Sequence, residues 1–155
     1  MRSLDTWLTE YGDSHRHPTN ELLHVLCVPP IVIAVLGLLW SLPVPAAIRG
    51  LTPLANWASL AVLAGLAYYA TLSLRLALGM LPLLAIGLGL IAALDRLTVP
   101  LWQTSLAIFI VAWIGQFVGH AVEGKRPSFF KDVQFLLIGP LWLLSFVFQK
   151  LGLRY

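Results

Sequence analysis

The feature that most constrains this chain is the near absence of charge between Val25 and Leu94, where only Arg49 and Arg75 are charged. A stretch this apolar cannot supply the polar surface that a water-soluble globule needs. Over the whole chain, 59% of the residues are hydrophobic, 11% are charged, and the mean hydropathy is +0.84. We therefore expect an integral membrane protein.

The predicted fold class is all-α, a polytopic membrane helical bundle of four to five spans preceded by a short N-terminal interfacial helix. No polar linker is long enough to divide the chain, so residues 1–155 are expected to form a single integral membrane domain. The net charge of +3 is small and confined to loops. It suits contact with anionic lipid better than nucleic-acid binding. We expect membrane lipid as a partner and no nucleic acid; the sequence sets no oligomeric state.

Five apolar segments are predicted to enter the membrane, because each approaches the roughly 20 residues that cross a hydrocarbon core about 30 Å thick. Arg75 alone separates the second segment from the third, which favours a hairpin with Arg75 at its tip over one long bent helix. Pro29 and Pro30 are expected to kink or locally unwind the first segment. The fifth, interrupted by Gly139 and Pro140, either spans or lies partly in the surface. The segments are 25–42, 54–74, 76–94, 100–121 and 133–149.

A short amphipathic helix is predicted ahead of the first span. Apolar and aromatic side chains recur there at helical spacing behind Ser3, which can act as an N-cap. Trp and Tyr favour the membrane interface, so we expect this helix to lie there. The next helix is predicted to start at Pro18, with Thr19 or Asn20 as its cap. The residues of the amphipathic repeat are Leu4, Trp7, Leu8 and Tyr11.

The four histidines flank the predicted spans in a way that allows them to meet. His15, His17 and His24 precede the first span, and His120 ends the fourth. Four crossings return a chain to the side where it began, so both groups face the same leaflet. That side also carries most of the loop Lys and Arg, and the positive-inside rule makes it cytoplasmic. The basic residues assigned to it are Arg2, Arg16, Arg75, Lys125, Arg126 and Lys131, against Arg49 and Arg96 on the other side.

Polar residues of the fourth span share one stripe of the helix. Gln116, His120 and Glu123 are spaced at i, i+4 and i+7, and Asn20 and His24 similarly stand one turn apart at the start of the first span. Polar groups gathered at one depth in a membrane protein indicate a functional site. Two glycines on a neighbouring stripe of the fourth span form a small-xxx-small pair that allows another helix to approach closely; they are Gly115 and Gly119.

Histidines that converge at a membrane face indicate a metal site. Neutral imidazoles bind Fe(II) or Zn(II), and each usually needs a partner on its other ring nitrogen. We predict His15, His24 and His120 as ligands. His17 stays open as a fourth, although His15 and His17 do not share a helical face. A single histidine near a membrane interface is more often a hydrogen-bonded surface or packing residue than a ligand, and for His17 we favour that role; the convergence of the others favours a site.

The polar neighbours of the histidines have two interpretations each. Asn20, Gln116 and Glu123 can support the chemistry, or Asn20 and Gln116 can simply hydrogen-bond between helices. Lys125 and Arg126 either bind an acidic substrate or only set the topology. The chain has no glycine-rich nucleotide loop.

The chain contains two motif-like stretches, in this order and with helical spans between them: Tyr11-x-x-x-His15-x-x-Pro18-x-Asn20-x-x-x-His24-x-x-x-x-Pro29 and Trp113-Ile-Gly-Gln116-Phe-Val-Gly-His120-Ala-Val-Glu123-Gly-Lys-Arg126-Pro127. They resemble the motifs of the Mpo1-like family over the whole layout of the chain. The resemblance implies that His15, His24 and His120 bind iron. It matches further polar positions, to which we assign catalytic roles (Asn20, Gln116, Glu123) and substrate-binding roles (Tyr11, Lys125, Arg126).

The family's yeast member is an iron(II)-dependent dioxygenase of 2-hydroxy fatty acids in phytosphingosine breakdown. The resemblance therefore implies a non-haem iron(II) dioxygenase that takes a 2-hydroxy fatty acid and O2 and shortens the acid by one carbon, with Fe(II) as cofactor. The chain departs from the family pattern at His17, where Asn is usual, and at Ser128, where Ala is common. Because of the first departure, His17 remains a candidate for a fourth ligand.

Two other classes of function are compatible with the same residues. One is a non-enzymatic membrane module that binds lipid or haem through the histidines. The other is a zinc-dependent lipid hydrolase with Glu123 as the base beside a zinc-bound water. In each case we expect an integral protein of a bacterial inner membrane or an ER-like membrane, with the site facing the cytoplasm.

Overall fold

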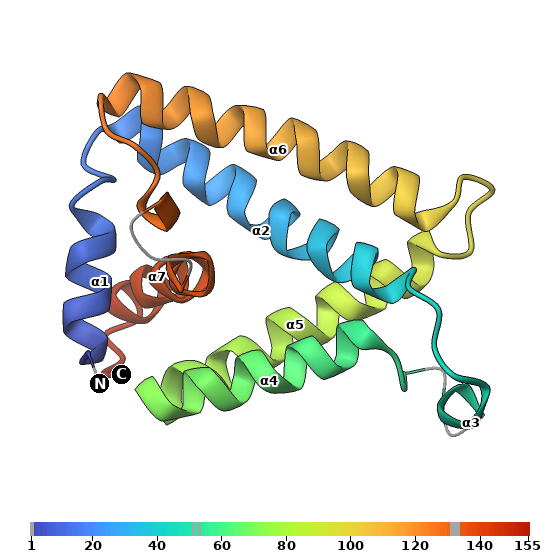
Figure 1. Cartoon of the computed structure of the whole chain (residues 1–155). Helices are drawn as coiled ribbons and strands as arrows, with labels where there is room; N and C mark the ends of the chain where they lie inside the picture. Colours follow the sequence, from blue (N-terminus) through green and yellow to red (C-terminus); the bar gives the residue numbers. More distant parts are fainter. Residues whose placement is uncertain (1, 51, 53, 131–133) are drawn as a thin grey trace.

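The computed structural model describes residues 2–50, 52, 54–130 and 134–155, and every regular element within them is helical (Figure 1). The all-α prediction is confirmed for these ranges. Lys131 and Val133, which the sequence analysis placed in a basic loop and at the start of the last span, lie outside the described residues. The elements are α1 (Leu4–Gly12), α2 (Pro18–Trp40), α3 (Ala46–Arg49), α4 (Trp57–Leu72), α5 (Leu74–Leu94), α6 (Leu101–Glu123), the short 3-10 helix η1 (Ser128–Phe130) and α7 (Phe135–Lys150).

The first two helices start on polar caps. Ser3 caps α1 as predicted, because its side chain accepts a hydrogen bond from the backbone N–H of Thr6 at 3.2 Å. The predicted cap of α2 is wrong. His17, and neither Thr19 nor Asn20, is the N-cap, and its Nδ1 accepts from the backbone N–H of Thr19 at 3.2 Å. Pro18 explains the difference, since a proline fits the first helical position and places the cap one residue earlier.

The predicted hairpin between α4 and α5 is confirmed, but it turns at Ser73 and not at Arg75. Ser73 has extended backbone (φ −159°, ψ 117°), and its N–H donates to the Tyr69 carbonyl at the end of α4. Its hydroxyl then accepts from the Leu76 N–H and so starts α5. Arg75 lies in the first turn of α5 and donates to the Arg154 carbonyl at 3.2 Å.

Three of the described helices, α2, α5 and α6, are long and apolar enough to cross a membrane, with 23, 21 and 23 residues. The apolar helices α4 and α7 have 16 residues each, or about 24 Å at 1.5 Å per residue, short of a core about 30 Å thick. The expectation of four to five spans is therefore not confirmed. Helix α2 runs through Pro29 and Pro30 without interruption, so the predicted unwinding is absent. Outward-facing Ile86 and Val111 are 69% and 70% exposed, as suits contact with lipid.

Helices α2 and α6 lie side by side as an antiparallel pair (Figure 1). Their contact depends on the two glycines that the sequence analysis singled out. A Cβ on Gly115 would lie 2.6 Å from the Cys27 Sγ, and one on Gly119 would collide with the side chain of Asn20. The predicted close approach of a helix to this stripe is confirmed, and it brings the first turns of α2 against the last turns of α6.

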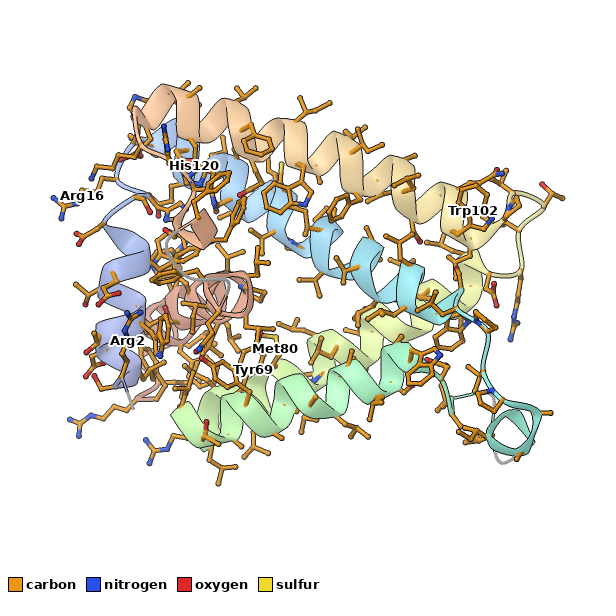
Figure 2. All side chains as sticks on the ribbon, in the orientation of Figure 1. Arg2, Arg16, Tyr69, Met80, Trp102 and His120 are labelled. Atoms are coloured by element: carbon orange, nitrogen blue, oxygen red, sulfur yellow. The ribbon has the colours of Figure 1, made fainter. Side chains whose placement is uncertain are left out.

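Apolar clusters join the remaining helices to this pair. One fixes α1 to α7, a second joins α4, α5 and α7 around Tyr69 and Met80 (Figure 2), and a third joins α2, α4, α5 and α6 at the opposite end. As Figure 1 shows, the α2–α6 pair and the α4–α5 hairpin approach each other at one end and diverge at the other, where α1 and α7 lie. Representative buried residues of the clusters are Trp7, Phe135 and Trp142 in the first, Leu76 and Leu141 in the second, and Leu36, Ile91 and Leu101 in the third.

The α2–α6 contact yields a stability prediction. Gly115→Ala is expected to destabilise the protein by about 1–3 kcal/mol, because overpacking at a close contact forces the helices apart. The melting temperature in detergent measures this. Cys27→Ala in the same chain removes the opposing Sγ and is expected to restore most of the loss. The control is Gly65→Ala, where an added Cβ meets nothing within 4 Å; equal melting of the Gly115→Ala and Gly65→Ala proteins would contradict the contact.

Candidate metal centre

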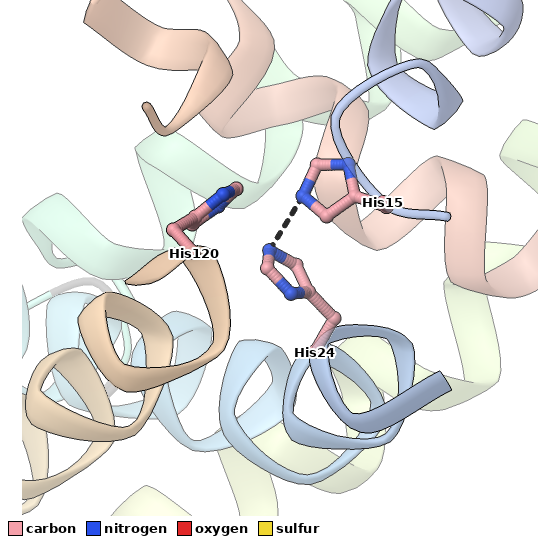
Figure 3. A group of neighbouring side chains, drawn as sticks. All are labelled: His15, His24 and His120. Carbon is pink, nitrogen blue, oxygen red and sulfur yellow. Dashed lines mark hydrogen bonds between the residues drawn. The ribbon is translucent and has the colours of Figure 1, made fainter. Parts of the chain in front are cut away.

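Three histidines from three separate segments meet at the end of α6 that lies opposite Trp102 (Figures 2 and 3). His15 lies in the loop between α1 and α2, His24 in the second turn of α2, and His120 in the last turn of α6. They are only 4%, 2% and 5% exposed, and one ligand atom from each lies within 4.8 Å of the others. The predicted convergence of these three side chains is confirmed, and the group could hold a metal ion.

Backbone carbonyls fix the tautomer of two of these rings. His15 Nδ1 lies 2.5 Å from the Tyr11 carbonyl oxygen, and His24 Nδ1 lies 3.0 Å from the Asn20 carbonyl oxygen. A carbonyl oxygen only accepts hydrogen bonds, so each Nδ1 carries the proton and each neutral ring keeps a lone pair on Nε2. Such second partners orient a histidine for metal binding.

The two Nε2 atoms face each other at 2.8 Å (Figure 3). Burial lowers the pKa of the His15 imidazole to about 4, so this ring is neutral near pH 7. Two lone pairs this close repel unless a positive charge lies between them. His120 adds a third nitrogen whose lone pair can bind a metal, since its Nδ1 is buried without a hydrogen-bond partner in the described part of the chain. The donor set therefore fits a divalent transition metal, for which imidazole is a common ligand.

Tyr11 supports His15 from the side. Its ring stacks on the imidazole with centroids 4.2 Å apart and planes 17° apart. Its hydroxyl packs against α7 at Gly139, where an added Cβ would lie 2.8 Å from the Tyr11 oxygen. Burial raises the pKa of the Tyr11 phenol, so the hydroxyl stays protonated. Tyr11 also lines the cavity at the histidines, as its predicted role in substrate binding requires.

Glu123 ties the end of α6 to the loop that carries His15. Its carboxylate accepts hydrogen bonds from the backbone N–H of His17 at 2.7 Å and of Arg16 at 3.1 Å, and from the Asn20 side chain at 3.3 Å. The Asn20 amide also donates to the Ser14 carbonyl at 3.0 Å. Glu123 is not a member of the group that could hold the metal. The Glu123 carboxylate thus holds the loop that carries His15 against the end of α6.

The other predicted site residues are divided between the cavity and the surface. Gln116 lines the cavity and donates to the Leu23 carbonyl at 3.3 Å. Lys125 donates to the Asp13 carbonyl at 2.5 Å and so also holds the loop before α2. Arg126 is exposed at the same end. His17 is exposed and serves as the cap of α2, outside the histidine group.

The cavity beside the three histidines has a volume of about 60 Å³. Its walls combine the histidines with apolar residues of α2, α6, η1 and α7, among them Val28, Trp113 and Phe129. The indole N–H of Trp113 is buried without a hydrogen-bond partner in the described residues. The sequence analysis did not propose Trp113 as a functional residue, although its place on the stripe of Gln116 and His120 was a usable signal.

Similarity to known proteins identifies the family of the chain. The sequence profile described as 2-hydroxy-palmitic acid dioxygenase Mpo1-like matches residues 1–151. The chain belongs to the Mpo1-like family. It is 31% identical over 154 residues to the 2-hydroxy-palmitic acid dioxygenase MPO1 of Saccharomyces cerevisiae, a match that covers 98% of this chain and 83% of the yeast protein. No solved structure matches the chain. The predicted family is thus confirmed.

One contact near the histidines of this Mpo1-like chain could not be predicted from its sequence. Ser128, which follows Pro127 in the second motif, is buried, and its hydroxyl lies 2.5 Å from that of Ser14. The pair joins η1 to the loop that carries His15. A separation of 114 residues between two serines gives no indication of contact.

The hydrogen bonds of Glu123 to the loop predict that metal binding depends on this residue, although it is not one of the candidate ligands. Glu123→Ala is expected to weaken metal binding about 10–100-fold, the usual effect of losing a group that positions a ligand, because the loop with His15 loses its anchor. Titration of the purified protein with Fe(II) or Zn(II) measures the affinity. The matched control is Glu10→Ala, which removes an exposed carboxylate that is paired with Arg2 at 3.4 Å and lies outside the group of three histidines. Unchanged affinity in Glu123→Ala would contradict the positioning role.

Proposed function

We propose that this chain is a non-haem iron(II) dioxygenase that shortens 2-hydroxy fatty acids by one carbon, with its site facing the cytoplasm. The observation that carries the proposal is the convergence of three buried histidines, two of them with lone pairs directed at each other, in a chain of this family. The name of the yeast relative supports a long-chain 2-hydroxy acid as substrate.

The proposed reaction balances without a further reductant. A 2-hydroxy acid, RCH(OH)COOH, and O2 give the shortened acid RCOOH, CO2 and water. The bond between the carboxyl carbon and the hydroxyl-bearing carbon breaks, and these carbons lose the four electrons that reduce O2. A bound iron(II) ion supplies the redox chemistry and open coordination positions for the acid and O2.

The residues of the chain prepare this site in distinct ways. The Tyr11 and Asn20 carbonyls hold the His15 and His24 rings with their Nε2 atoms toward the metal position. The burial of all three histidines limits competing water. Gln116, whose amide N–H is held by a backbone carbonyl, presents the rest of its polar group to the cavity wall. We assign it a role in orienting the substrate.

Basic groups at the same end support both the orientation in the membrane and the choice of an acidic substrate. Arg2 and Arg16 lie at the His120 end of the molecule (Figure 2). Arg126 is exposed near the end of α6, and Lys125 lies beside it. By the positive-inside rule this end faces the cytoplasm. Arg2 and Arg16 are paired with Glu10 and Asp13. We therefore assign Arg126 as the charge-assisted partner of a carboxylate that approaches from this face.

The alternative functions fit the site less well. The cavity of about 60 Å³ beside the histidines leaves no room for a haem macrocycle. A zinc hydrolase needs a carboxylate base, but the Glu123 carboxylate already accepts hydrogen bonds from three N–H groups. The cavity volume therefore argues against haem, and the contacts of Glu123 argue against a zinc hydrolase.

Removal of either helical ligand tests the function. In His24→Ala and in His120→Ala, iron content and oxygen uptake with 2-hydroxypalmitate are expected to fall together to background, because two imidazoles no longer complete the ligand set. Metal analysis after anaerobic iron loading, and an oxygen electrode, provide the two measurements. The control His17→Asn keeps a side chain that can cap α2, and it should retain both iron and activity.

Two results would refute the proposal. Full oxygen uptake in either variant would show that the histidines are not the iron site. A wild-type protein that binds iron at the histidines and consumes no oxygen with any 2-hydroxy acid would leave the metal site in place but exclude this reaction.

A further inference from the structure

The cavity at the histidines is too small for a whole 2-hydroxy fatty acid. Its volume of about 60 Å³ suits the carboxyl and hydroxyl groups of the acid, while a chain of sixteen carbons needs several times that space. The acyl chain must therefore leave the metal centre along the protein. This step rests on the proposed function, since it assumes a long-chain acid at the histidines.

A second, larger cavity of about 570 Å³ lies between α2, α5 and α7 and forms a groove. Its walls are almost entirely apolar, with Val25, Ile33 and Leu144 among the side chains that line it. The polar lining residues are confined to the first turn of α2 and the end of α7. They are Glu21, Gln149 and Lys150.

The groove adjoins the cavity at the histidines. Val28 and Val32 line both the small cavity and the large one. On α7, Gly139 lines the small cavity and Pro140, the next residue, lines the large one. A chain that starts at the histidines therefore reaches the groove past Val28, without crossing a polar surface.

The length of the groove suits a long acyl chain. From His24 at the metal centre to Leu36, the last residue of α2 that lines the groove, the helix rises about 18 Å at 1.5 Å per residue. A sixteen-carbon zigzag chain built from bonds of about 1.5 Å extends about 19 Å. The distance from the histidines to the far end of the groove thus matches such a chain.

We propose that the groove between α2, α5 and α7 binds the acyl chain of the 2-hydroxy acid, and that Gly87 on α5 keeps it open for long chains. Gly87 is buried and lines the groove. A Cβ added there would meet only the Ile33 side chain, at 4.0 Å. A larger side chain at this position therefore projects into the groove without disturbing the helix packing.

Substitution of Gly87 tests the proposal through chain-length selectivity. The rates of oxygen uptake of iron-loaded protein are compared for 2-hydroxyhexadecanoate and 2-hydroxyoctanoate. In Gly87→Leu the ratio of the long-chain rate to the short-chain rate is expected to fall at least ten-fold. In Gly89→Leu, an exposed glycine of the same helix where an added Cβ meets nothing within 4 Å, the ratio is expected to stay at the wild-type value. An unchanged ratio in Gly87→Leu would overturn the proposal and indicate that the groove contacts bilayer lipid instead of the substrate.

A second measurement does not depend on turnover. A sixteen-carbon 2-hydroxy acid with a diazirine near its last carbon is photolysed with the full chain in detergent, and the labelled residues are mapped by mass spectrometry. Labels on α5 and α7 residues of the groove, lost in Gly87→Leu and retained in Gly89→Leu, are expected. Labels elsewhere would overturn the acyl site. Groove labelling in a protein that consumes no oxygen would uphold the acyl site while the proposed reaction fails.

Discussion

The close antiparallel approach of α2 and α6 is the constraint on which the rest of the structure depends. It is possible because Gly115 and Gly119 present no side chain toward α2, and close packing of this kind is a main source of helix association in membranes, where hydrophobic burial contributes little. The pairing sets His24 and His120 at the same level, with ring centroids 5.0 Å apart. A shift of α2 along α6 by one turn, about 5.4 Å, would separate the two rings.

Two helices alone do not complete the site, because neither carries a second histidine one turn from the first. The third histidine, His15, comes from a loop, and a loop must be held to position a side chain for binding. The Glu123 carboxylate and the Lys125 ammonium each bond to backbone groups of that loop, and the Ser14–Ser128 pair adds a third link. Glu123 and Lys125 make these contacts at the end of α6, where they are only partly buried or exposed, so their charges stay hydrated.

Hydropathy and spacing were sufficient to predict the helical class, the α4–α5 hairpin and the meeting of His15, His24 and His120, because the order of spans limits which ends can meet. They did not predict which groups complete local hydrogen bonds. The cap at His17 and the turn at Ser73 depend on single N–H partners that a periodic pattern does not encode. The span count differs for a related reason: apolar runs extend past helix ends, so a run of 21 residues can contain a helix of 16, as in α4.

The short helix α7 shows why such a difference matters for function. It packs at the end of the molecule where the α2–α6 pair and the α4–α5 hairpin diverge, with Gly139 against Tyr11 beside the metal centre and Leu144 along the groove. A side chain at Gly139 would displace Tyr11 and with it the stacked ring of His15. Because α7 contributes to the walls of both cavities, it couples the position of a metal ligand to the shape of the apolar groove. In the proposed enzyme, α7 thus borders both the site of the carboxyl and hydroxyl groups of the substrate and the groove for its acyl chain.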